Sequence, residues 1–104
     1  MDLGIKGKVA LVAAASQGLG RAVADELAAE GASLVICSRS EERIDEASKA
    51  IRERTGADVI GIAGDLSKVD DVNRIFSEGI SRFGQIDILV TNTGGPPAGP
   101  FDSL

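Results

Sequence analysis

Histidine, tyrosine and tryptophan are absent from this 104-residue sequence, and cysteine and methionine occur once each. Because three phenylalanines are the only aromatic residues, the core has to be built from valine, isoleucine, leucine and alanine. The usual nitrogen and sulfur ligands of a metal site are almost entirely missing. The lone Cys37 cannot form an internal disulfide, lies in an apolar run where it should pack as a small hydrophobe, and fits a reducing cytoplasm.

Long hydrophobic runs and an excess of positive charge are also missing. No apolar stretch approaches the roughly 20 residues of a membrane span, and the start of the chain lacks the features of a signal peptide. The net charge is −5, from 11 basic and 16 acidic residues, so the overall field opposes nucleic acids and anionic membrane surfaces. We therefore expect neither kind of partner, and any bound phosphate must be held by local dipoles and particular cations.

The stretch 9–24 predicts a buried strand, a tight glycine turn and the start of a helix. An apolar run over residues 9–15 is followed by Gly18 and Gly20, after which apolar residues recur at helical spacing. The expected apolar face of this helix consists of Leu19, Ala22, Val23 and Leu27. Such a turn aims free backbone N–H groups at the space above the strand end, which suits a pyrophosphate. The alternative is a plain strand-to-helix turn with glycines for close packing.

A comparison of helix starts favours the anion site. The second and third predicted helices open with residues 40–42 (Ser-Glu-Glu) and 67–71 (Ser-Lys-Val-Asp-Asp), which place a capping hydroxyl and carboxylates at the positive end of the helix dipole. The first helix instead carries Arg21 in its first turn and has no acid before Asp25. We expect this helix end to be left for the phosphates of a ligand.

Strands and helices alternate along the chain. Strands are expected over residues 8–14, 33–38, 58–63 and 86–91, and helices over 18–30, 41–55 and 68–83. The third helix is expected to bury one stripe, made of Val69, Val72, Phe76, Ile80 and Phe83. Glycines at 31, 56 and 84 follow the helices as C-terminal caps. This alternation implies βαβ units, a parallel sheet and right-handed crossovers.

The order of these elements and four motifs resemble the short-chain dehydrogenase/reductase family, and within it the 3-oxoacyl-acyl-carrier-protein reductase-like members. The motifs are the turn at 13–20, Ser38-Arg39, residues 64–66 (Gly-Asp-Leu) and residues 89–94 (Leu-Val-Thr-Asn-Thr-Gly). The resemblance implies an α/β fold, the N-terminal half of a Rossmann doubly wound parallel sheet with strand order 3-2-1-4. Residues 1–104 would form the cofactor-binding part of a single Rossmann-fold domain.

The family's first motif reads T-G-x-x-x-G-x-G, and its last two glycines are present here. Alanines replace the threonine and the first glycine, and the methyl group of Ala14 narrows the approach of a nucleotide and disfavours positive φ. Ser16 and Gln17 are expected to add hydrogen-bond donors, with ordinary turn chemistry as the alternative. The cofactor-binding candidates in this turn are Ala14, Ser16, Gln17, Gly18 and Leu19.

The tip of the second strand bears on the choice between NADP and NAD. Family members that bind NAD carry an acid here, which accepts from the ribose hydroxyls and repels a 2′-phosphate. This sequence has Ser38-Arg39, with no acid before Glu41. Arg39 can fork onto a phosphate and Ser38 can donate to it, so the resemblance implies NADP(H) rather than NAD(H). Alternatively, Arg39 is a solvated loop residue that pairs with Glu41 or Glu42.

Two further motifs imply contacts with the cofactor. Asp65-Leu66 matches the family's adenine-edge contact, in which the carboxylate accepts from the exocyclic amine, although Asp65 can equally be a helix cap. Asn92, Thr93 and Gly94 match the family's N-A-G segment, which passes along the ribose and nicotinamide.

The chemistry that the resemblance implies is hydride transfer between a nicotinamide and a small carbonyl or alcohol, with a 3-oxoacyl thioester as one candidate. The family uses a Tyr acid/base, a Lys four residues later and a Ser. Because this chain contains no tyrosine, we assign no catalytic residue and expect the N-terminal half of a longer reductase, inactive alone.

The expected fourth strand would leave a bare apolar edge, with Ile86, Ile88 and Val90, and one sheet face without helices. Such an edge tends to pair with other chains, so we expect a homo-oligomer. A non-catalytic nucleotide-binding or self-associating half-domain is the alternative function. A phosphate-binding NTPase is disfavoured, because no Gly-Lys-Ser/Thr follows the glycine turn.

Overall fold

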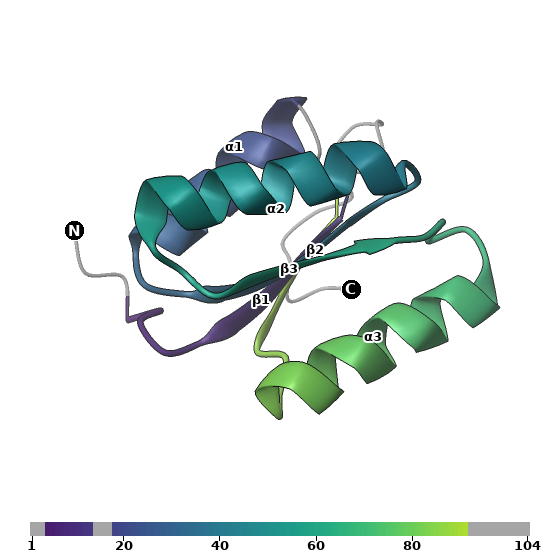
Figure 1. The fold of residues 1–104 in the computed structure, drawn as a ribbon. Helices are drawn as coiled ribbons and strands as arrows, with labels where there is room; N and C mark the ends of the chain where they lie inside the picture. The colour runs from purple at the N-terminus through teal and green to yellow at the C-terminus, as the bar shows by residue number, and fades with distance from the viewer. Residues whose placement is uncertain (1–3, 14–17, 92–104) are drawn as a thin grey trace.

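The computed structural model describes residues 4–13 and 18–91 of the chain. Its strands and helices alternate in the order predicted (Figure 1). The elements are β1 (Val9–Ala13), α1 (Gly18–Ala29), β2 (Ser33–Ser38), α2 (Glu41–Thr55), β3 (Val59–Ala63), α3 (Val69–Phe83) and β4 (Ile88–Val90). In this described part, no helix has both the length and the apolar character needed to cross a bilayer.

The strands form one parallel sheet in the order β3-β2-β1-β4, which confirms the predicted topology. β1 pairs with β2 on one side and with β4 on the other, so that Leu11 lies between Val35 and Leu89. Helices α1 and α2 cover one face of the sheet and α3 lies against the other (Figure 1). The expectation that one face would lack helices was therefore wrong.

The two central strands carry the core. Every residue of β1 is buried, because this strand is covered by neighbours on both sides and by helices on both faces. Alternate side chains enter opposite layers: Val12 and Ile36 pack beneath α1 and α2, whereas Leu11 and Val35 pack towards α3. The largest fully buried side chains are aliphatic apart from Cys37, which confirms the core composition expected from the scarcity of aromatics.

Helix α1 buries a different face from the one predicted. Its buried residues are Gly20, Ala24 and Ala28, spaced four apart, while the side chain of Leu19 is 68% exposed. Small residues on this row allow the helix to approach the sheet closely. The larger apolar residues Val23 and Leu27 are only half-buried, at the margins of the contact.

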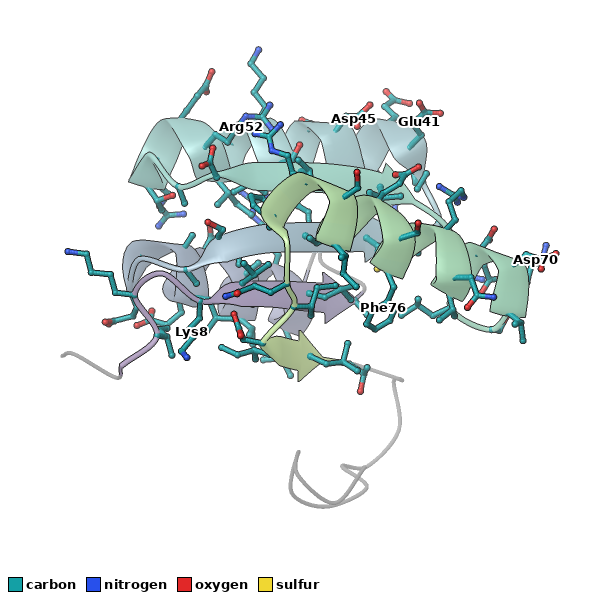
Figure 2. All side chains as sticks on the ribbon, turned by 90° about the horizontal axis from the view of Figure 1, so that it is seen from below. Lys8, Glu41, Asp45, Arg52, Asp70 and Phe76 are labelled. Atoms are coloured by element: carbon teal, nitrogen blue, oxygen red, sulfur yellow. The ribbon has the colours of Figure 1, made fainter. Side chains whose placement is uncertain are left out.

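The predicted stripe of α3 is also only partly correct. Ile75 and Gly79 are the fully buried positions, whereas Val69 is 73% and Ile80 48% exposed. Phe76, which is labelled in Figure 2, is half-buried against the same layer, and so is Phe83. Helix α3 approaches β2 closely at Gly79, because a Cβ at this position would lie only 3.0 Å from Val35 Cγ2.

Helix starts differ in how they are capped. Ser40 caps α2 as predicted, since its Oγ accepts from the backbone N–H of Arg43 at 3.2 Å. The capping role expected for Ser67 was wrong: Lys68 occupies the N-cap of α3 without a side-chain cap bond, and Ser67 hydrogen-bonds to Asp65 instead.

Strand β4 is shorter than the predicted 86–91. Ile86 precedes the strand and packs in the layer beside α3, while Ile88 and Val90 pack against the opposite layer. Within the described residues β4 pairs with β1 alone, so Ile88 and Val90 lie on an edge strand as expected, whereas Ile86 lies outside the strand. Asp87 marks the start of the pairing: its backbone N–H donates to Val9 O at 2.8 Å, and its Oδ2 accepts from Val9 N at 2.9 Å.

We predict that Asp87→Ala lowers the free energy of unfolding by roughly 1–3 kcal/mol, because the buried N–H of Val9 loses its acceptor. Urea denaturation would measure the change. The matched control is Asp58→Ala, since Asp58 is exposed and its carboxylate lies 3.7 Å from Arg82 at the surface. Equal destabilisation by the two substitutions would contradict the role assigned to Asp87.

A candidate dinucleotide site at the strand ends

The carboxyl ends of β2 and β3 lie side by side, because the strands are parallel and paired almost to their ends. Ser38 pairs with Ala63, and the backbone N–H of Gly64 donates to Ser38 O at 2.8 Å. Arg39 and Asp65, which follow these strands, are thereby brought to the same edge of the sheet. In parallel sheets of this kind, ligands bind outside the carboxyl ends of the strands.

An open hollow of about 360 Å³ lies at this edge. Its lining contains three cationic and two carboxylate side chains, and consists of Arg39, Ala63, Gly64, Asp65, Lys68, Asp71 and Arg74. The net positive lining contrasts with the overall charge of −5. The structure thus brings Arg39 and Asp65 into one pocket, and it adds Lys68, Asp71 and Arg74, which sequence reasoning missed.

Asp65 is held as an anion. Its Oδ1 accepts from Ser67 Oγ at 2.7 Å and from Ser67 N at 2.9 Å. The hydrogen bond from the Ser67 hydroxyl, followed by the one from the Ser67 backbone N–H, lowers the pKa of the Asp65 carboxyl. Desolvation opposes this lowering, and the charges of Arg39 and Lys68 add smaller lowering effects. The helix-cap alternative for Asp65 was wrong, because Lys68 is the N-cap of α3 and no side chain caps this helix. The adenine contact stays a prediction, and the turn supplies the ionised acceptor that it needs.

The missed residues Asp71 and Arg74 hold the backbone on either side of Gly64. Asp71 Oδ2 accepts from Asp65 N at 2.8 Å, and Arg74 Nη2 donates to Ala63 O at 2.6 Å. Arg74 Nη2 also lies 3.6 Å from Asp71 Oδ1. The i, i+3 spacing of an acid and an arginine in the first turns of the third helix was the available signal.

Gly64 is required by this arrangement. A Cβ at position 64 would lie 2.8 Å from Ile75 Cδ1 and 3.1 Å from Arg74 Nη2. The turn therefore fits closely against α3, which leaves the pocket floor without a side chain at this position.

Ser38 and Arg39 differ in the interactions that their side chains form within the protein. Ser38 Oγ donates to Ser40 O at 3.2 Å and accepts from Ser40 N at 3.3 Å, which is local turn chemistry. Arg39 is exposed, and within the described part of the chain it forms no ion pair with Glu41 or Glu42. Its guanidinium therefore remains available in the pocket.

The start of α1 fits a tight glycine turn. Gly18 has φ 66°, a conformation that residues with a side chain rarely adopt. The first turn of α1 contains no acid, in contrast to α2 and α3. Arg21, however, is not left unpaired: its Nε lies 3.3 Å from Asp25 Oδ2, which is also 3.6 Å from Arg54 Nη1. The charge of Arg21 is thus compensated within the protein, which weakens the inference drawn from helix starts.

The remaining candidates are unevenly placed. Leu66 is half-buried and packs against the layer beside α3. The candidates Ala14, Ser16, Gln17, Asn92, Thr93 and Gly94 lie outside the described residues. Over residues 4–13 and 18–91, no group of three or more His, Cys, Asp or Glu side chains is arranged to hold a metal ion.

Comparison with known proteins agrees with this geometry. The family model described as short chain dehydrogenase matches residues 8–104. Dehydrogenase/reductase SDR family member 4 of Caenorhabditis elegans is 43% identical over 93 residues, which cover 89% of this chain and 36% of that protein. The chain therefore belongs to the short-chain dehydrogenase/reductase family, and it spans roughly a third of the length of this relative.

Solved structures show the same half-fold with nicotinamide dinucleotides bound. L-Sorbose reductase from Gluconobacter frateurii, complexed with NADPH and L-sorbose, matches all of this chain and 40% of its own, with a TM-score of 0.87 and 36% identity. A short-chain dehydrogenase/reductase from Burkholderia phymatum, in complex with NAD, covers 82% of this chain and 30% of its own, with a TM-score of 0.79 and 32% identity. These neighbours leave the choice of cofactor open.

We predict that Ser67→Ala raises the pKa of Asp65 towards its ordinary value of 3.8, because the largest lowering contribution is lost. A carboxyl with a lowered pKa stabilises the fold above pH 3.8, and this contribution disappears as the pH falls through the lowered pKa. Carboxyl carbon NMR titration would measure both pKa values. Ser81→Ala, at an exposed position of α3, is the control and should leave Asp65 unchanged.

Proposed function

We propose that this chain supplies the dinucleotide-binding part of an NADP-dependent reductase that transfers hydride to a small carbonyl substrate. The observation that carries the proposal is the position of Arg39, which enters a positively lined pocket from the end of β2, where NAD-binding relatives are expected to carry an acid. A 2′-phosphate there would meet the guanidinium of Arg39 and the ammonium of Lys68. The adenine would lie near the ionised carboxylate of Asp65.

The pyrophosphate would lie above the turn before α1. The positive φ of Gly18 and the absence of a first-turn acid in α1 support this placement. In the proposed complex, backbone N–H groups at Gly18 and Leu19 donate to phosphate oxygens. Ala14, Ser16 and Gln17 would complete the turn, and residues 92–94 would pass along the ribose and nicotinamide. The cofactor would supply the hydride, while the residues of this chain bind and orient it.

For the substrate, we propose a carbonyl compound, with a 3-oxoacyl thioester as the first candidate. The neighbour from Gluconobacter frateurii binds a sugar ketone, L-sorbose, and this class is the obvious competitor. Since the sequence contains no tyrosine, we propose that the chain does not catalyse hydride transfer alone. Consumption of NADPH with an acetoacetyl thioester, L-sorbose and a simple ketone, by the chain alone and by the chain joined to the C-terminal part of a family member, would test both statements.

We predict that Arg39→Asp weakens NADPH binding roughly 10- to 100-fold, because a charge-assisted contact is replaced by repulsion. NADH affinity should stay the same or improve, since an acid at this position can accept from the ribose hydroxyls. Isothermal titration calorimetry with both dinucleotides would measure the change in preference.

Arg43→Asp is the matched control for Arg39→Asp. It makes the same change in charge at an exposed position of α2 that does not line the pocket. We expect its NADPH affinity to change less than about threefold, because exposed charges at this distance are screened. If the two variants lose NADPH affinity equally, Arg39 does not read the 2′-phosphate.

A self-associating half-domain is the second candidate function. In the part of the chain that the structure describes, β4 pairs with β1 alone, so its other edge carries free backbone groups. We predict a dimer by light scattering of the purified polypeptide, with slow amide exchange at residues 88–90. A monomer whose NADPH binding is unimpaired would exclude this function and leave the first intact.

A further inference from the structure

The turn that carries Asp65 is held by side chains of α3 in addition to its own hydrogen bonds. Two backbone groups next to Gly64 form hydrogen bonds with side chains of α3. The N–H of Asp65 donates to Asp71, and the carbonyl oxygen of Ala63 accepts from Arg74. These bonds measure 2.8 and 2.6 Å, and the two side chains approach each other to 3.6 Å. Since glycine is the most flexible residue, this is the point in the turn where an external hold has the greatest effect.

The two carboxylate oxygens of Asp65 differ in their hydrogen bonding. Both hydrogen bonds from Ser67 reach Oδ1. Among the described residues, no hydrogen bond reaches Oδ2, and the residue lines the open pocket. A carboxylate held in this way can present a single acceptor to a ligand amine, provided that its backbone does not move.

We propose that Asp71 and Arg74 are positioning residues that set the Asp65 carboxylate for recognition of the exocyclic amine of an adenine. They act through backbone bonds on either side of Gly64, without touching the adenine. The inference rests on the proposed function, because it needs the adenosine end of the dinucleotide in this pocket. It goes beyond the proposed function by naming the residues that orient the Asp65 carboxylate, so that Asp65 recognises an amine and does not act through its negative charge alone.

The test compares NADPH with its hypoxanthine analogue, which has a carbonyl oxygen in place of the exocyclic amine. The wild-type protein should bind NADPH roughly tenfold more tightly, the effect of one charge-assisted hydrogen bond. Asp65→Ala should abolish this preference. Asp71→Ala should reduce it to a similar extent, although residue 71 does not contact the amine, and the double variant should lose no more than either single variant.

Two controls separate positioning from general damage to the helix. Asp70→Ala removes the same charge from the same helix turn, where Asp70 projects outward at the start of α3 (Figure 2), so it should retain the preference. Asp71→Asn keeps an oxygen that can accept from Asp65 N–H and should recover most of it. Amide exchange should accelerate at Asp65 in Asp71→Ala while β2 and β3 remain protected, which shows that the variant is folded.

Each outcome bears on a different statement. If Asp71→Ala keeps the tenfold preference, or if the wild type binds both dinucleotides equally, the positioning role is wrong and the proposed function stands. If the wild type binds neither dinucleotide, the proposed function is wrong and the positioning role is overturned with it.

Discussion

The hydrogen bond from Gly64 N–H to Ser38 O is the contact on which the arrangement of the pocket depends. It is the last bond between β2 and β3, and it fixes the point at which both chains leave the sheet. Because the strands run parallel, everything that follows them emerges at one edge. Arg39 and Asp65, which lie 26 positions apart in the sequence (65 − 39), become neighbours in one pocket for this reason.

Most of the fold was predictable because the central strands are buried on both faces. Strands β1 and β2 appear in the sequence as continuous apolar runs, and the glycines after the helices mark their ends. Helix faces were harder to predict. The contact face of α1 is a row of glycine and alanine, which hydrophobicity alone cannot distinguish from solvent-exposed alanine. The contact of α3 runs through Ile75 and Gly79, and the close approach of Val35 to position 79 gives a glycine a place on this row that a hydrophobicity pattern does not predict.

The candidate site was only half visible in the sequence. Ser38-Arg39 and Asp65-Leu66 could be found because they follow strands in a fixed order. Asp71 and Arg74 left only the signal of their i, i+3 spacing, since they lie on a helix whose rotation about its axis is decided by packing. The pairing of Arg21 with Asp25 removes one argument for the phosphate site: a cation at a helix start suggested a missing anion, yet the next turn of the same helix supplies one.

The row of small residues on α1 has a consequence for how the first strand and helix can vary. With Gly20, Ala24 and Ala28 as its buried residues, α1 can pack close to the sheet. A bulkier side chain at any of these positions would push α1 away from the sheet or tilt it. Substitutions at these three small residues would therefore change how far the start of α1 lies from the sheet.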